Sequence, residues 1–197
     1  VDKPVPRTRS RILLAFCSVF SFVFHPLLMT LATALLAYNL MPTRFLPLSS
    51  QQFANWTKEL SLYTVILPLV SIALFRFSGL ISNARMHRAK DRSLPLIATM
   101  VFYILSYWVF NYKHHAPSVF RSLLLGSSIS IVIIFIINIF YKVSVHTAAA
   151  AISPGFLLAL AINNQESLFL PLLATVCVAL FVGVIRWLLG AHTIGQI

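Results

Sequence analysis

The sequence is poor in charged residues and above all in acids. Of its 197 residues 10% are charged, and Asp and Glu number four, against 15 Lys and Arg. Soluble domains carry about 25% charged residues, so this composition excludes an ordinary soluble domain. The four acids are scattered along the chain at Asp2, Glu59, Asp91 and Glu166. Because Mg²⁺ and two-metal sites require clustered carboxylates, we expect no site of either kind. We also expect no other cofactor.

Cysteine is also scarce, with Cys17 and Cys177 alone. Both lie inside apolar runs, which favours packing roles over a disulfide. The net charge is +11, but no basic segment of domain size is present to indicate a nucleic-acid partner. In a membrane protein such an excess indicates anionic lipid headgroups or loops that orient the chain.

Apolar residues make up 59% of the chain, in runs that recur along its whole length. A membrane helix needs about 20 residues. The segments of spanning length are 12–40, 60–81, 94–112, 118–141, 145–162 and 168–189. The connections between them are short. We therefore predict an all-α polytopic membrane helical bundle of about six transmembrane helices, with a basic N-terminal tail over 1–11 and a single transmembrane domain over 12–197.

Three polar interruptions have ordinary explanations. His25-Pro26 divides the first segment, which favours a kink over contact with a buried partner. Ser153-Pro154-Gly155 lies within the fifth segment, and a bent helix buried among others tolerates it. We expect no acid or thiol near the pair His114-His115, so a polar loop is favoured over a metal site.

Counting crossings assigns the polar segments to membrane faces. The N-terminal tail, the loop 82–93, the corner 142–146 and the end 186–196 fall on one face. That face holds eleven of the 15 basic residues: Lys3, Arg7, Arg9, Arg11, Arg76, Arg85, Arg88, Lys90, Arg92, Lys142 and Arg186. The excess predicts a cytoplasmic face, unless several of these arginines serve to bind phosphate.

The loop "SNARMHRAKDRSLP" is the densest group of charges. Arg85, Arg88 and Arg92 follow an i, i+3, i+7 spacing and share one stripe of a helix. Three guanidinium groups on one stripe suit an anion with several oxygens. A loop that only sets the topology of the chain explains the charge equally well.

Two further stretches on the same face carry histidine. In "YKVSVHTAAAA", Ser144 and His146 precede four alanines that allow close helix packing. Taken alone, this stretch favours a simple helix cap by Ser144 or Thr147. In "RWLLGAHTIGQI", Arg186 and His192 are about 600° apart on a continuous helix. A break at Gly190 would let both reach one ligand.

A new helix from His192 would place Gln196 one turn further along the same face. Gln196 could then accept a hydrogen bond from the His192 ring and fix its tautomer. The three polar stretches all fall on one face, and ionisable groups at membrane depth are costly and usually functional. We therefore expect them to converge at the mouth of the bundle.

These residues resemble the integral membrane branch of the type 2 phosphatidic acid phosphatase superfamily. Its pattern is K-x6-R-P, then P-S-G-H, then S-R-x5-H-x3-D. The third block is similar to Arg186, His192 and Gln196, the second to Ser144-Val145-His146, and the first to Arg85 and Arg92, with Pro95 two positions late. The resemblance covers about residues 82–197, and "LGAHTIGQI" is similar to a variant bacterial subgroup with Gln at the last position.

The resemblance implies a phosphatase of lipid phosphates or pyrophosphates in the bacterial inner membrane. His192 would be the nucleophile and His146 the general acid, while Gln196 replaces an Asp that would stabilise the imidazolium of His192. The groups that would hold phosphate are Arg186, Arg92, Arg85, Arg88 and Ser144. Undecaprenyl pyrophosphate, phosphatidic acid and phosphatidylglycerol phosphate are the substrate classes it implies, and the partners are membrane lipids.

Two alternatives remain open at this stage. Gln can orient an imidazole but supplies no negative charge, and in a related triad a neutral amide costs catalysis heavily. The first alternative is therefore a protein on the same scaffold that binds or transports a lipid phosphate without turnover. A structural membrane protein whose basic loops only set topology is the third possibility. The sequence does not determine the oligomeric state.

Overall fold

The structure is a computed structural model that describes residues 10–81, 89–163 and 168–197, with only the backbone at 89–91. The described residues form helices and connections, with no strand among them. Helices long and apolar enough to cross a membrane are Ser50–Phe77, Arg92–Lys113, Ser118–Phe140, Val145–Asn163 and Phe169–Leu188. A bent pair, Arg11–Val23 with Pro26–Leu40, makes a sixth if it is one span. The all-α polytopic membrane bundle is confirmed.

The chain forms two compact units, each described here by itself. The central unit is Thr30–Lys142. It holds most of α2 (Pro26–Leu40), then η1 (Pro42–Phe45), α3 (Ser50–Ser61), η2 (Leu62–Ile66), α4 (Leu67–Phe77), α5 (Ala89–Trp108), η3 (Val109–Lys113) and α6 (Ser118–Phe140). The terminal unit is Val1–Met29 with Val143–Ile197. It holds α1 (Arg11–Val23), α7 (Val145–Ala150), α8 (Ile152–Asn163), α9 (Phe169–Leu188) and η4 (Ile194–Gln196).

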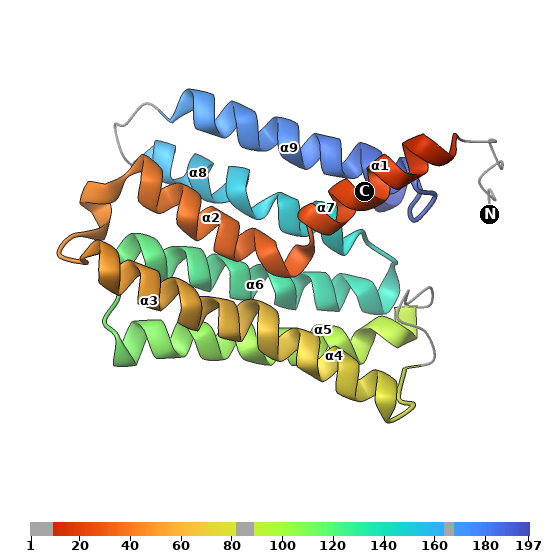
Figure 1. Ribbon diagram of the computed structural model, residues 1–197, viewed down its shortest axis with the longest axis horizontal. Helices are drawn as coiled ribbons and strands as arrows, with labels where there is room; N and C mark the ends of the chain where they lie inside the picture. The colour runs from red at the N-terminus through yellow and green to blue at the C-terminus, as the bar shows by residue number, and fades with distance from the viewer. Residues whose placement is uncertain (1–9, 82–88, 164–167) are drawn as a thin grey trace. The chain divides into compact units, whose positions relative to one another are not determined.

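In the central unit α5 and α6 lie side by side (Figure 1). Helix α6 shows the pattern of a helix in lipid, because several of its polar side chains are buried and many of its large apolar ones are exposed. Ser127, Ser128 and Asn138 are buried. The exposed apolar side chains of α6 are Leu125, Ile129, Ile133, Ile136, Ile137, Ile139 and Phe140. Such a surface would be unfavourable in water and is stable against lipid tails.

The buried hydroxyls of the central unit bond across helices. The Thr30 hydroxyl of α2 donates to Ser127 Oγ at 3.1 Å. Ser128 Oγ donates to the backbone oxygen of Tyr103 at 3.0 Å. Interhelical hydrogen bonds of this kind contribute about 0.6 kcal/mol each in membrane proteins. They tie α2, α5 and α6 together.

The second span begins earlier than the apolar pattern predicts. We expected it to begin at residue 60, but the helix starts at Ser50. The Ser49 side chain accepts from the backbone N–H of Gln52, and the Gln52 side chain accepts from the backbone N–H of Ser49. This capping box stabilises a polar first turn that an apolar pattern does not reveal. The π turn η2 ends at Ile66, two residues before Pro68, whose missing N–H prevents a regular helical bond.

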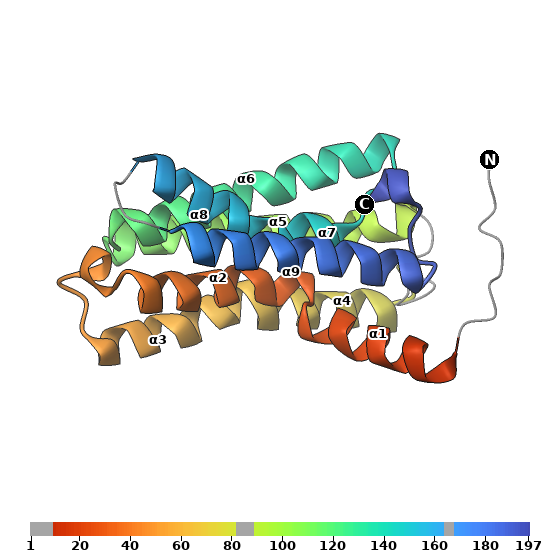
Figure 2. The same ribbon diagram turned by 90° about the horizontal axis from the view of Figure 1, so that it is seen from above.

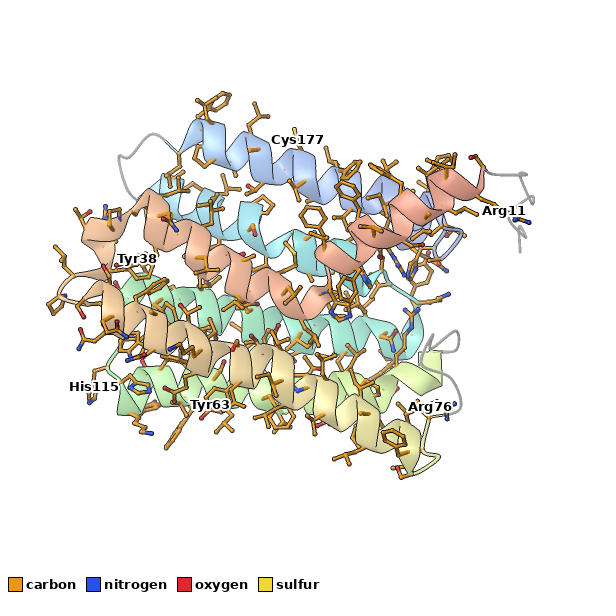
Figure 3. The ribbon with its side chains drawn as sticks, in the orientation of Figure 1. Arg11, Tyr38, Tyr63, Arg76, His115 and Cys177 are labelled. Atoms are coloured by element: carbon orange, nitrogen blue, oxygen red, sulfur yellow. The ribbon has the colours of Figure 1, made fainter. Side chains whose placement is uncertain are left out.

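The loop ends of the central unit carry a close contact between a histidine and a carboxylate that the sequence did not reveal. His114 Nε2 lies 2.8 Å from Glu59 Oε2. The expectation that no acid is near His114 is therefore wrong. The rings of Trp56 and Phe110 lie beside His114, at 5.4 and 5.2 Å between centroids. Figure 3 shows His115 at this end of the unit and Arg76 at the opposite end, as expected for helices that cross a membrane.

In the terminal unit α9 packs along α8, α7 and α1. Figures 1 and 2 both show α8 and α9 side by side. Ala149 and Ala150 of α7 are buried against Val182 of α9, so the alanine run allows the close packing that we expected. Cys17 is buried on α1, as predicted, but Cys177 is exposed on α9 (Figure 3), so its packing prediction is wrong. Neither cysteine forms a disulfide.

The first apolar segment is divided into α1 and α2 at Phe24 and His25. Helix α1 ends at Val23, and α2 begins at Pro26. Proline is well suited to the first position of a helix, because the missing N–H has no helical partner there. The prediction of a break at His25-Pro26 is confirmed. The prediction of a single transmembrane domain over 12–197 stays a prediction.

Candidate functional site

The C-terminal end of α9 places Arg186 in its last turn, followed by a sharp change of direction. Gly190 adopts φ +66°, a conformation that favours glycine. Its N–H donates to Trp187 O at 2.9 Å, and the N–H of Ala191 donates to Arg186 O at 3.1 Å. This pair of bonds is a Schellman motif, which ends a helix. The predicted break at Gly190 is confirmed.

After the break the chain forms a short turn and not a new helix from His192. His192 is buried, with 6% of its surface exposed. The turn η4 comprises Ile194–Gln196, with Thr193 as its cap. The amide oxygen of Gln196 accepts from the backbone N–H of Thr193 at 3.3 Å. The expected new helix from His192 is therefore wrong, while the hydrogen bond from the His192 ring to Gln196 stays a prediction.

The beginning of α7 lies against this C-terminal turn. Ser144 is fully buried and caps α7, because its Oγ accepts from the N–H of Thr147 at 3.4 Å and from the Thr147 hydroxyl at 3.0 Å. The capping interpretation of Ser144 is confirmed, and its phosphate contact stays a prediction. The backbone N–H of Ser144 donates to the carbonyl oxygen of Gln196 at 2.8 Å. The second and third polar stretches of the sequence thus come together in one unit.

His146 follows Ser144 by two residues and meets a second histidine. The ring of His25 lies 5.6 Å from the ring of His146 between centroids, with an angle of 77° between the planes. The backbone N–H of Leu27 donates to His25 Nδ1 at 3.4 Å. A nitrogen that accepts carries no proton, so in the neutral ring the hydrogen is on Nε2. His25 is half-buried at the break between α1 and α2.

Arg186 of α9 is held by a residue of α1. Its Nη1 donates to the hydroxyl oxygen of Ser21 on α1 at 2.9 Å. Its charge also acts electrostatically on the His25 ring. Phe20 of α1 packs edge-on against Phe181 of α9, with ring centroids 5.4 Å apart. This contact holds the two helices at the separation that the bond between Ser21 and Arg186 requires.

The described residues of the terminal unit include no Asp or Glu, since Asp2 and Glu166 fall outside them. Across the described part of the chain, no three side chains of His, Cys, Asp or Glu gather as metal ligands do. The polar groups that this unit offers a ligand are a guanidinium, imidazoles and hydroxyls. Guanidinium donates in a fork that matches the oxygens of phosphate. The arrangement suits an anion.

The first polar stretch falls partly in the central unit and partly outside the described residues. Arg92 lies in α5, in the central unit. Arg85 and Arg88 lie outside the described residues. Their part in a phosphate site, and the common membrane face of all the polar stretches, stay predictions.

The sequence did not single out Ser21 or His25 as site residues. His25 carried one signal, since an ionisable residue stood at the interruption of an apolar run. The kink explained it adequately. Ser21 carried none, because a single serine in an apolar helix usually bonds to its own backbone.

Comparison of the chain with protein-family models, with curated proteins and with solved structures finds no match.

Proposed function

We propose that the protein is an integral membrane phosphatase of lipid phosphates or pyrophosphates, in the inner membrane of a bacterium, which acts through a phosphohistidine intermediate and without a metal. The observation that carries the proposal is the hydrogen bond of 2.8 Å from Ser144 N to Gln196 O. It brings the segment that holds His146 to the segment that holds His192, in the unit that also contains Arg186.

The proposed chemistry uses two histidines in turn. In the first step a ring nitrogen of His192 forms a bond to phosphorus while the bond from phosphorus to the lipid oxygen breaks, and His146 gives that oxygen a proton. In the second step water attacks phosphorus, His146 takes a proton from the water, and the bond to His192 breaks. Arg186 stabilises the negative charge on the phosphoryl oxygens.

The membrane setting supports a lipid as the carrier of the phosphate. Large apolar side chains are exposed on the helices of both units, as lipid contact requires. A substrate anchored in the same membrane diffuses to the protein laterally, and its headgroup lies at the level of helix ends such as that of Arg186. The proposed partners are therefore membrane lipids and a lipid phosphate.

A second candidate function follows from Gln196. Its amide oxygen accepts from the backbone of Thr193 and carries no formal charge. An imidazolium on His192 therefore gains no compensating charge from this residue. A protein that binds or transports a lipid phosphate without hydrolysing it needs no such charge, and the same cationic groups would serve it.

The test is a panel of lipid phosphates and pyrophosphates assayed with the purified wild type and His192→Ala. The phosphatase proposal expects phosphate release that vanadate inhibits and that His192→Ala abolishes. The matched control is His115→Asn, which changes an exposed histidine of the central unit and keeps a residue that tolerates its φ of +48°. Saturable binding of the panel without any release would contradict the phosphatase proposal and support the binding protein. If the protein shows no binding and no release, both proposed functions are wrong.

A further inference from the structure

We infer that the break between α1 and α2 is a further part of the site, in which Ser21 positions Arg186 and His25 positions His146. The inference rests on the proposed function for its kinetic consequences. Its structural content is independent, because it concerns which groups hold the two side chains in place.

Ser21 restricts a side chain that is otherwise flexible. Arginine has several rotatable bonds, and a guanidinium binds phosphate well only when its plane is fixed. The bond of 2.9 Å from Arg186 Nη1 to Ser21 Oγ fixes one corner of that plane. Ser21 is buried, at 9% exposure, so the bond is shielded from competing water.

The break itself does not require a histidine. Pro26 alone accounts for the end of α1, since proline disfavours the helical conformation in the residue before it. An imidazole that is half-buried beside Arg186 has lost part of its hydration. Its placement is therefore better explained by the groups that it contacts than by the bend.

The contact that His25 makes restricts the ring of His146. An edge-to-face pair with centroids 5.6 Å apart holds both ring planes. The N–H of Leu27 in turn fixes the His25 ring through Nδ1. A proton on His25 would add a second positive charge beside Arg186, which acts on it electrostatically. His25, as a neutral ring, is therefore suited to hold His146 in place. It is not suited to act as the acid in place of His146.

The first test compares pairs of variants by steady-state kinetics on a lipid phosphate. Ser21→Ala is expected to raise KM about tenfold, with kcat changed less than about threefold, because it weakens binding by Arg186. Its matched control is Ser18→Ala, since the Ser18 hydroxyl, also on α1, bonds only to Leu14 O of the same helix at 2.8 Å. If Ser21→Ala and Ser18→Ala behave alike, the role of Ser21 is wrong.

His25→Ala is expected to lower kcat about tenfold with little change in KM, because it loosens the proposed acid and leaves the phosphate contacts. His25→Phe keeps a ring against His146 and should recover most of kcat. His115→Asn is the control and should match the wild type. A His25→Phe variant as slow as His25→Ala, or a His25→Ala variant as fast as the wild type, contradicts the positioning role.

A second measurement needs no turnover. In protein labelled at histidine, the ring resonances of His146 are assigned by loss in His146→Gln. They should move in His25→Ala, move less in His25→Phe and stay in place in Ser18→Ala. Unmoved resonances overturn the inference for His25 even if the protein is an active phosphatase. Moved resonances in a protein that releases no phosphate refute the phosphatase and leave the positioning of His146 standing.

Discussion

The backbone N–H of Ser144 donates a hydrogen bond of 2.8 Å to the carbonyl oxygen of Gln196. The bond joins the cap of α7 to the turn that follows α9, and both segments carry a histidine that the sequence marked as polar within an apolar chain. It uses backbone atoms alone. The two segments therefore stay together when the side chains are changed, which makes the following side-chain substitutions informative.

Gly183 permits this C-terminal turn to lie against α9. A Cβ at Gly183 would lie 2.8 Å from Ile197 Cγ2 and 3.7 Å from Thr147 Cγ2. Gly183→Ala should displace Ile197 and reduce phosphate release several-fold. This reduction corresponds to an increase of about 1 kcal/mol in activation free energy. The gain in helix propensity, about 1 kcal/mol, should keep the thermal midpoint near that of the wild type.

Gly126→Ala is the matched control for Gly183→Ala. It lies in α6, and a Cβ there meets nothing within 4 Å. It should keep full activity and show an equal or higher midpoint in a thermal melt. Equal activity of the two variants would show that the turn does not depend on close contact with α9.

Arg186→Lys should bind lipid phosphate more weakly although it keeps the charge. Lysine lacks the planar fork and cannot reproduce both the bond to Ser21 and two parallel bonds to phosphate. We expect KM to rise about tenfold or more, which corresponds to about 1.4 kcal/mol. Arg76→Lys, at the exposed end of α4, should be unchanged in the same assay. A lysine variant with the KM of the wild type would exclude bidentate binding by Arg186.

Gln196→Glu adds the negative charge that the site lacks while it keeps the cap. Glu has the same length and retains an oxygen for the N–H of Thr193, and Glu is common at this position of a capping box. A carboxylate that stabilises an imidazolium on His192 should raise kcat about threefold to tenfold. It should also raise KM, because it repels the substrate. Gln196→Ala, which loses the cap, should lower kcat; a rise in both variants would rule out the charge as the cause.

Glu59→Gln should destabilise the central unit without changing phosphate release. The Glu59–His114 pair is partly buried, with side-chain exposures of 28% and 22%, and its atoms are 2.8 Å apart. Its loss should cost about 1 kcal/mol of unfolding free energy, seen as a lower midpoint in detergent. Lys58→Gln, an exposed neighbour on α3, should leave the midpoint unchanged. A fall in activity at full stability would instead link the Glu59–His114 contact to the proposed site.

The sequence predicted the spans well wherever apolar residues alone define them. The last three predicted segments agree with Ser118–Phe140, Val145–Asn163 and Phe169–Leu188 to within one residue, inside the usual uncertainty of helix ends. The third, predicted to begin at residue 94, agrees at its end, but its helix already begins at Ala89. The second failed at its start, because polar residues from Ser50 to Glu59 continue a capped helix beyond the apolar run. Hydropathy reports burial in lipid and not the helical conformation itself.

In the candidate site, the features that depend on residues close together in the sequence were predictable. The break at Gly190 followed from a glycine after an apolar helix, and the cap at Ser144 from a hydroxyl before one. The expected new helix from His192 was wrong, because Thr193 caps a three-residue turn instead. The expectation that no acid is near His114 was wrong, because Glu59 is distant in the sequence and lies on another helix.

By itself the sequence determined the membrane environment, the helical class and the ends of most spans, since these depend on residues near one another in the chain. Tertiary structure alone decided that Ser21 bonds to Arg186 and that His25 packs on His146. Those contacts join α1 and the break after it to α9 and α7, and no local pattern encodes such a pairing. A serine and a histidine in an apolar helix become informative only once packing shows which side chains they meet.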